Sequence, residues 1–276
     1  MCYRGKTIVI DSAIFMYRFG STDDLYEKFY NLILVLKKNR INGVFIFDGK
    51  PPPEKLETIN ERKQRRIECE DEYNTLVDNN MLCKYNPRKI QQLKRAKTVV
   101  TNENITNIKF IIQNSGFTFI DAPGESDSLC SYFVNNNFAY ACMSDDMDMV
   151  LYGCHRILRY FSLINETVIQ YDLFDILNSL NITHNNLRLI CFIKGTDYSK
   201  EKDITLATLF NIYYKMKETM TDDEITVNIL TNNESIDVES ISKLEKIYTI
   251  QNSLYKSYDH DIHIKHVENI DQVALF

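Results

Sequence analysis

The amino-acid sequence predicts an α/β protein with a mostly parallel sheet. Continuous apolar runs of four to six residues alternate with helical patterns, which is typical of strands buried on both faces. Four of these runs lead into acidic residues, at 7–11, 44–48, 117–127 and 140–148. Ligands of such sheets bind beside the carboxyl ends of the strands, so we expect acidic side chains to meet at one edge.

These gathered acids predict a divalent-metal site. Carboxylates on one edge repel one another and are costly to desolvate, so they either protonate or share cations. Ligands that are all oxygen select hard ions such as Mg²⁺ or Mn²⁺. Two such ions about 4 Å apart can hold the attacking and leaving oxygens of a phosphoryl displacement. A single Asp at a strand end is more often a helix cap or turn residue, but four recurrences favour the metal site.

Length and composition describe an ordinary globular chain. Its 276 residues, 44% hydrophobic and 25% charged, can bury a full core. No apolar run approaches the roughly 18 residues that cross a bilayer, and the N-terminal segment lacks a signal-peptide core. We therefore expect an intracellular protein in a reducing compartment, with no membrane partner. Seven scattered cysteines without Cys-x-x-Cys spacing predict reduced, buried thiols. The regularly spaced His260, His263 and His266 lack a Cys partner, which favours an exposed tail over a metal site.

Helical periodicity and capping residues predict the elements between the strands. Residues 12–19 form a short apolar helix, and Ser21 to Asp24 has the form of a capping box that opens a helix to about Asn39. Further helices are expected at 105–113, after Glu125, at 187–193 and at 205–216. The Asp-, Glu- and Asn-rich remainder predicts no firm element.

A basic segment follows the second strand. Three prolines at 51–53 interrupt regular structure, and residues 54–99 are then rich in Lys and Arg. Lys55, Arg62 and Arg66 have the spacing of one helical face. Such a charge run is more often a solvated helix pair, but directly after a strand that ends in an acid it can also bind a phosphate backbone. The net charge of −6 argues against a general nucleic-acid coat, although an acidic total can conceal a local basic surface.

Five motifs, in order and with compatible spacing, resemble the flap endonuclease branch of the XPG family of structure-specific nucleases. They lie within residues 4–198: Ile10-Asp11 with Tyr17, Phe47-Asp-Gly-Lys-Pro-Pro52, Ala122-Pro-Gly-Glu125-Ser-Asp127, Ser144-Asp-Asp146-Met-Asp148, and Gly195-Thr-Asp197-Tyr198. Each motif is weak alone, and the ordered set is a strong signal. The resemblance implies a PIN-like sheet flanked by helices, with a basic helical arch at about 50–100 inserted after the second strand.

The resemblance also implies roles for particular residues. Seven carboxylates match those that hold two divalent ions, Mg²⁺ or alternatively Mn²⁺: Asp11, Asp48, Glu125, Asp127, Asp146, Asp148 and Asp197. Asp145 falls where relatives often have a residue that is not a ligand. Lys55 and Arg62 match basic arch residues that contact the scissile phosphate, with Arg65 and Arg66 beside them as further DNA contacts. Tyr17 matches an aromatic residue that stacks on a base near the cut.

The implied activity is metal-dependent hydrolysis of DNA at 5′ flaps or 5′ ends, in replication, recombination or repair. The implied partner is branched or 5′-ended DNA. Residues 272–276 resemble the first half of a sliding-clamp motif, which makes a clamp a second expected partner. We expect a monomer, located in the nucleus or at a cytoplasmic site of viral replication.

The expected organisation is a nuclease domain over residues 1–198, with an N-region at 1–100 and an I-region at 115–198, followed by a divergent helical extension at 199–276. Relatives carry a Gly-rich helical hairpin after Gly-Thr-Asp-Tyr, whereas residues 199–206 contain no Gly. Two alternatives stay open: a PIN-like ribonuclease, and a non-catalytic nucleic-acid-binding module of the same fold. An aspartyl phosphatase is disfavoured because Asp11-Ser-Ala lacks a second Asp two residues later.

Overall fold

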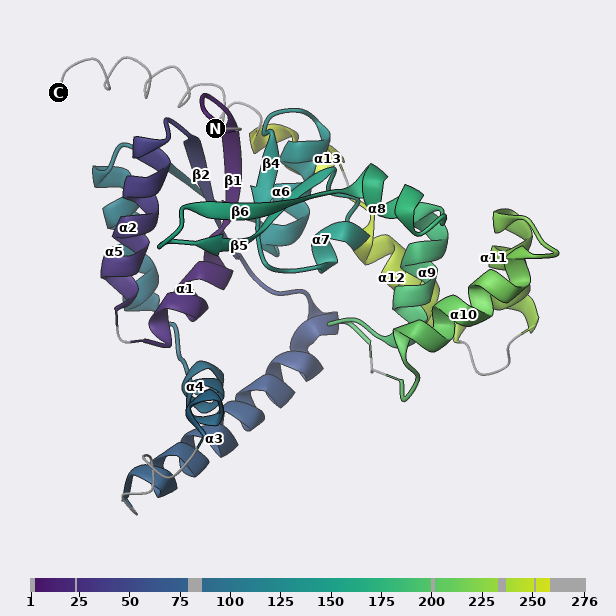
Figure 1. Cartoon of the computed structure of the whole chain (residues 1–276), viewed down its shortest axis with the longest axis horizontal. Coiled ribbons are helices and arrows are strands. Elements are labelled where there is room, and N and C mark those ends of the chain that lie inside the picture. The colour runs from purple at the N-terminus through teal and green to yellow at the C-terminus, as the bar shows by residue number, and fades with distance from the viewer. Residues whose placement is uncertain are drawn as a thin grey trace.

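The centre of the structure is a six-stranded sheet. The computed structural model describes residues 3–22, 24–78, 86–199, 202–232, 237–250 and 252–258. The strand order is β3-β2-β1-β4-β5-β6 (Figure 1). The strands are β1 (Thr7–Asp11), β2 (Asn42–Phe47), β3 (Thr118–Asp121), β4 (Ala141–Met143), β5 (Arg156–Ser162) and β6 (Thr167–Asp172). All neighbouring strands pair in parallel except β5 and β6, which are antiparallel. The predicted mostly parallel α/β sheet is confirmed.

Two hydrophobic cores, one on each face, explain why the strands are continuously apolar. Ile8 and Ile10 of β1 pack on one face, while Val9 packs on the other. The first face is covered by α1 (Ser12–Gly20), α2 (Leu25–Lys38) and α5 (Asn102–Asn114). The second is covered by α6 (Ser126–Asn135), α7 (Asp148–Leu151), α8 (Leu173–Ser179), α9 (His184–Lys194) and α10 (Leu206–Lys217). A strand buried on both faces has no polar side to alternate with its apolar one.

The β5–β6 hairpin was not predicted. Its first strand interleaves arginine with apolar residues, and β6 is an edge strand with largely exposed or half-buried residues. Arg156 makes an ion pair with Asp172 across the two strands, at 3.7 Å. A bulge interrupts the pairing near Tyr160, which has a φ of 55°. The β-branched run that begins at Thr167, after a polar turn, was the available signal for this hairpin.

The predicted capping box at Ser21 is wrong, although the helix after it is present. The Ser21 hydroxyl donates to the carbonyl of Arg18 at 2.9 Å, and Ser21 thereby closes α1. Asp24 precedes α2 without a side-chain cap bond and pairs with Lys28 at 3.2 Å. The linker between the two helices is so short that Ser21 lies at the C-terminal end of α1 and is not in position to cap α2.

The basic segment forms a pair of helices, and the longer of the two projects from the body of the protein (Figure 1). It comprises the 3₁₀ turn η1 (Pro53–Lys55), α3 (Leu56–Asp78) and α4 (Pro87–Ala96). Leu76 is the buried side chain of α3, and Leu93 is that of α4. Lys97 lies over the ring of Tyr73 at 4.2 Å. The other described side chains of the two helices are exposed or half-buried, so most of their surface is solvated.

The C-terminal helices pack onto α9 and α6. Helices α11 (Asp222–Asn232) and α12 (Val238–Tyr248) contact α9, whereas α13 (Asn252–Tyr255), which is followed by the 3₁₀ turn η3 (Lys256–Tyr258), contacts α6. Ile241, Leu244 and Tyr248 of α12 form a buried cluster with Leu151 of α7 and Phe192 of α9. The predicted helix at 205–216 is confirmed as α10. The spacing of the three α12 residues, on one helical face, was a signal for the unpredicted α12.

Several predictions from composition can be compared with the structure. No helix in the described ranges is both long and apolar enough to span a membrane. The described cysteines are free; Cys130, Cys142 and Cys154 are buried, as predicted, whereas Cys69 and Cys191 are only half-buried. The three C-terminal histidines and the clamp-like segment at 272–276 lie outside the described residues.

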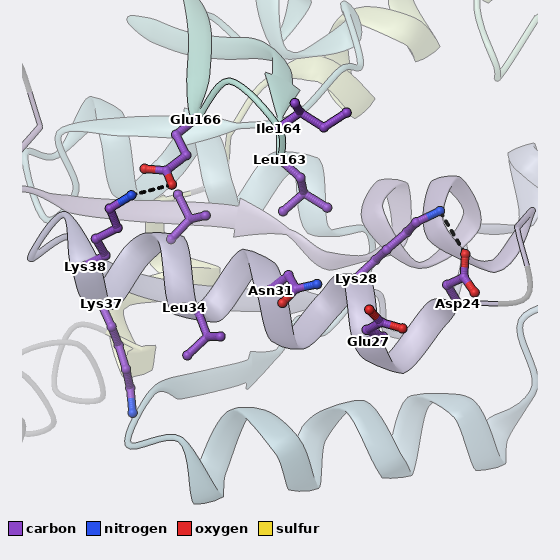
Figure 2. Close-up of a pocket in the computed structure, with 11 residues that line it drawn as sticks. Asp24, Glu27, Lys28, Asn31, Leu34, Lys37, Lys38, Leu163, Ile164 and Glu166 are labelled. Carbon is purple, nitrogen blue, oxygen red and sulfur yellow. Dashed lines mark hydrogen bonds and ion pairs between the residues drawn. The ribbon is translucent and has the colours of Figure 1, made fainter.

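A cavity of about 820 Å³ lies between α2 and the turn of the β5–β6 hairpin (Figure 2). Leu34, Leu163 and Ile164 contribute apolar surface to it, and Lys38 pairs with Glu166 at its rim at 2.7 Å. None of the residues predicted to act on a substrate lines this cavity. The predicted chemistry therefore has to be sought at the strand ends.

Candidate active site at the carboxyl ends of the strands

Acidic residues occupy the carboxyl ends of four neighbouring parallel strands. Asp11 ends β1, and Asp48 directly follows β2. Glu125 and Asp127 begin α6 after β3, and Asp146 and Asp148 follow β4. Asp197 arrives separately, just after α9. We call this set the acid edge: Asp11, Asp48, Glu125, Asp127, Asp146, Asp148 and Asp197.

The seven members of the acid edge form one electrostatic group. The charges of Asp11, Asp48, Asp146 and Glu125 all act on Asp127. Those of Asp146 and Asp197 act on Asp148. The structure thus brings together the seven residues predicted as metal ligands.

Serine hydroxyls and backbone amides hold the acid edge in place. Ser144 and Ser126 donate to the two carboxylate oxygens of Asp11, at 2.9 and 3.3 Å. The Ser126 amide donates to Asp48 at 2.8 Å, and the Asp148 amide donates to Asp146 at 2.8 Å. Ser126 and Ser144 were not predicted as site residues, although they lie within the motifs at 122–127 and 144–148.

Gly49 joins two segments of the edge. Its amide donates to the carbonyl of Gly124 at 2.6 Å. A Cβ atom on Gly49 would lie 2.0 Å from the carbonyl oxygen of Ala122, closer than any side chain can approach. A residue without a side chain is required here because it lets the loop carrying Asp48 lie against the loop carrying Glu125.

Burial and mutual repulsion raise the pKa of several carboxyl groups. Burial, followed by the charge of Asp48, raises the pKa of Asp11 to about 7, and Asp11 is 2% exposed. Burial and the charge of Asp146 raise the pKa of Asp148 to about 6. Burial and the charge of Asp11 also raise the pKa of Asp127. In the metal-free protein, the ionised forms of these carboxyl groups are therefore destabilised by burial and by one another.

The chemistry of these donors fits a hard divalent cation. All seven side chains offer oxygen, and a bound cation would relieve the repulsion that raises their pKa values. Within the described residues, however, no three acidic, histidine or cysteine side chains are arranged so that they could hold a metal ion as they stand. Side chains at the base of α3 balance part of the acidic charge.

Lys55 and Arg62 reach the acid edge from the base of the projecting helix. The Lys55 ammonium lies 2.6 Å from Glu125 and 3.3 Å from Asp197. Arg62 pairs with Asp197 at 2.5 Å. Burial lowers the pKa of Lys55, but contact with Glu125 and the nearby Asp197 outweigh it and raise the pKa above its ordinary value. Lys55 is thus a permanently charged group inside the site.

The other predicted DNA contacts do not meet the acid edge. Tyr17 is half exposed on α1, Arg65 is exposed on α3, and Arg66 is half buried on the same helix. Within the described part of the chain, none of the three makes a hydrogen bond or ion pair with the seven acids. Their roles stay predictions.

Asp145 has partners of its own. It accepts a hydrogen bond from the Tyr160 amide at 2.7 Å and pairs with Arg18 at 3.4 Å. These contacts tie the loop after β4 to β5 and to α1. That Asp145 is not a metal ligand stays a prediction.

Two tyrosines donate hydrogen bonds to the acid edge. The Tyr198 hydroxyl donates to Glu125, and the Tyr248 hydroxyl donates to Asp148 at 2.6 Å. Tyr152 lies within 3.2 Å of Tyr198, oxygen to oxygen. Tyr198 is part of a quoted motif. Tyr248 was missed, because it comes 51 residues after Asp197 in a segment with no recognised motif.

We expect the stability of the metal-free protein to fall by about 2–3 kcal/mol between pH 5 and pH 8. The pKa of Asp11 is about 7 in the folded protein and 3.8 in the unfolded chain. The folded state therefore binds more protons than the unfolded state between these values, and its stability decreases as pH rises through about 7. Asp148 acts in the same direction.

Urea denaturation in the presence of a chelator measures this dependence. His184, whose pKa burial lowers, changes stability in the opposite direction over this range. The comparison is therefore with Asp11→Asn, whose stability should decline less than that of wild type, with Asp127 and Asp148 supplying the remaining decline. Equal slopes for the two proteins would contradict the prediction.

The fold and the acid edge define a PIN-like α/β protein, with acids at the carboxyl ends of a parallel sheet and a basic helix above them. The model of the XPG N-terminal domain matches residues 1–69, and that of the XPG I-region matches residues 116–197. Together they cover more than half of the chain. The chain belongs to the XPG/Rad2-type flap endonuclease family.

Curated relatives are similar over much of this chain. Flap endonuclease 1 of Methanococcus aeolicus is 27% identical over 212 residues, covering 71% of this chain and 64% of the relative. That of Encephalitozoon cuniculi is 27% identical, with coverage of 71% and 60%. That of Mus musculus is 24% identical, with coverage of 71% and 55%. The chain thus matches less than two thirds of the length of these relatives.

Solved structures share the fold. The catalytic core of Rad2 in complex with DNA substrate superposes with a TM-score of 0.63 at 22% identity, covering 91% of this chain and 82% of the solved catalytic core. Flap endonuclease-1 from Methanococcus jannaschii superposes with a TM-score of 0.62 at 21% identity, covering 90% of this chain and 79% of the solved chain. GEN1 in complex with product DNA and Mg²⁺ superposes with a TM-score of 0.62 at 16% identity, covering 95% of this chain and 61% of the solved chain.

Proposed function

We propose that this chain is a divalent-metal-dependent nuclease that hydrolyses DNA phosphodiesters at 5′ flaps or 5′ ends. The observation that carries the proposal is the meeting of Lys55 and Arg62 with the acid edge. Basic side chains that can bind a phosphate stand directly beside oxygen ligands that can bind metal ions. The relatives named flap endonuclease and the DNA-bound structure of Rad2 support DNA as the substrate.

Each part of the site has a place in this reaction. Two bound Mg²⁺ or Mn²⁺ ions would activate a water molecule and neutralise charge on the phosphate. The acid edge would hold these ions. Lys55 and Arg62 would transfer their contacts from Glu125 and Asp197 to the oxygens of the scissile phosphate, where charge develops in the transition state. Tyr17, half exposed on α1, is free to stack on a base, which requires no particular sequence.

The wider biological role is part of the same proposal. A flap nuclease would act in replication, recombination or repair, in the nucleus or at a cytoplasmic site of viral replication. We further propose that residues 1–198 form the nuclease domain, that the protein acts as a monomer, and that a sliding clamp is a partner through residues 272–276.

Cleavage of an end-labelled 5′-flap DNA and of a matched single strand tests the proposal. Wild type should cut the flap near its junction with Mg²⁺ present and fail to do so with a chelator. The Asp148→Ala protein is the control for contaminating nucleases and should be inactive.

Other outcomes would point to the alternatives. Cleavage of a matched RNA but of neither DNA would favour a PIN-like ribonuclease. Retained binding of the flap in a gel-shift assay, without cleavage of any substrate, would favour a non-catalytic binding module.

A further inference from the structure

A tyrosine outside the matched family regions contacts the acid edge. Tyr248 ends α12, whereas the family match ends at residue 197. Its hydroxyl donates to Oδ2 of Asp148 at 2.6 Å, although the two residues are 100 positions apart. A charge-assisted hydrogen bond of this length is among the strong ones in proteins.

Packing fixes the position of the Tyr248 hydroxyl. The side chain is 1% exposed, and its ring centroid lies 4.8 Å from that of Tyr152 and 5.4 Å from that of Phe192. The helix is itself tied to α9, because Arg188 pairs with Glu245 at 2.8 Å. A buried ring held on several sides has little rotational freedom, so its hydroxyl stays directed at Asp148.

The bond occupies one acceptor direction of Asp148 and leaves others open. A carboxylate has two oxygens with about four lone-pair sites, so it can accept from a tyrosine and still ligate a cation. Groups that hold a metal ligand from behind orient it, and their loss typically weakens metal binding 10- to 100-fold. Tyr198 has the same relation to Glu125.

We propose that Tyr248 is a positioning residue that orients Asp148 for cation binding, so that the C-terminal extension completes the acid edge. This inference rests on the proposed function, since it takes the acid edge to be a metal site. It gives α12 a role in the chemistry of the site in addition to its packing against α9.

Titration calorimetry with Mn²⁺ tests the inference on wild type, Tyr248→Phe and Tyr213→Phe. Tyr213 is a matched control, because it is also 1% exposed and donates to an acid, Asp222, in the same extension. Tyr248→Phe should weaken Mn²⁺ binding about tenfold or more. Tyr213→Phe should bind as wild type does. In flap cleavage, Tyr248→Phe should need more Mg²⁺ for half-maximal rate, while its rate at saturating Mg²⁺ stays close to that of wild type.

The absorption of tyrosine gives an independent readout, because the chain has 17 tyrosines and no tryptophan. Adding Mn²⁺ to wild type should change the tyrosine absorption spectrum, and Tyr198→Phe, which removes the tyrosine that donates to Glu125, should retain this change. This comparison does not need Tyr248→Phe to fold.

The outcomes separate the inference from the proposed function. Wild-type affinity in Tyr248→Phe, or an equal loss in Tyr213→Phe, would overturn the role of Tyr248 while the metal site stands. An unchanged tyrosine spectrum in wild type that binds Mn²⁺ would also overturn it. Failure of wild type to bind Mn²⁺ or Mg²⁺ at pH 8 would overturn the proposed function, and the inference with it.

Discussion

Replacing Asp127 with asparagine is expected to abolish DNA cleavage and, at the same time, to stabilise the metal-free protein. Burial makes the charge of Asp127 costly, and repulsion by Asp11, Asp146, Asp48 and Glu125 adds to that cost. Asparagine has nearly the same shape without the charge, so the change should raise the free energy of unfolding at pH 8 by roughly 1–3 kcal/mol.

The same change removes a proposed metal ligand. Loss of metal-based charge stabilisation costs several kcal/mol in the transition state, so the cleavage rate should fall by about 10³-fold or more. Substitutions that remove charge repulsion from an active site commonly lower activity and raise stability together. Simple misfolding cannot produce this combination.

Flap cleavage in Mg²⁺ and chemical denaturation in a chelator measure the two effects. Asp121→Asn is the control, because Asp121 also ends a strand but is exposed and pairs with Lys109 at 2.5 Å. Loss of the ion pair between Asp121 and Lys109 should change activity and stability little, as is usual for exposed ion pairs. Destabilisation by Asp127→Asn, or unchanged cleavage, would contradict the assignment of Asp127 to the acid edge.

Lys55→Met is expected to slow flap cleavage by about 10²- to 10³-fold, comparable to the loss of one donor that stabilises transition-state charge elsewhere. Methionine retains much of the apolar stem of lysine but not its ammonium group. The Lys55 side chain is only 13% exposed between Glu125 and Asp197, so its removal leaves two acids without a counter-charge. The metal-free protein should therefore lose about 2 kcal/mol of stability.

Single-turnover cleavage at saturating Mg²⁺ measures the catalytic effect, and gel shift in Ca²⁺ measures DNA binding separately. Lys63→Met serves as the control, since Lys63 is exposed on α3, the helix that begins directly after Lys55. We expect Lys63→Met to affect DNA binding modestly and the cleavage step little. If Lys55→Met and Lys63→Met behave alike, the basic helix acts only as a general DNA-binding surface.

Much of the fold could be predicted because its signals are local. The four strands β1 to β4 are short apolar runs, and each leads into an acid that stands in the same run or a few residues beyond it. The β5–β6 hairpin was missed because its arginines are paired across strands and with a loop. Arg159 donates to the carbonyl of Asp145 at 2.7 Å, so its charge does not prevent it from lying in a sheet.

The sequence by itself determined the chemical character of the site: which acids follow apolar strands, and that parallel strands bring them to one edge. Only the tertiary structure decided which groups surround those acids. Lys55 meets Glu125 across 70 positions, and Tyr248 meets Asp148 across 100. An acid after a strand is a local pattern that a short stretch of sequence contains. A partner from a distant helix depends on how the helices pack in three dimensions, and no short stretch of sequence contains that information.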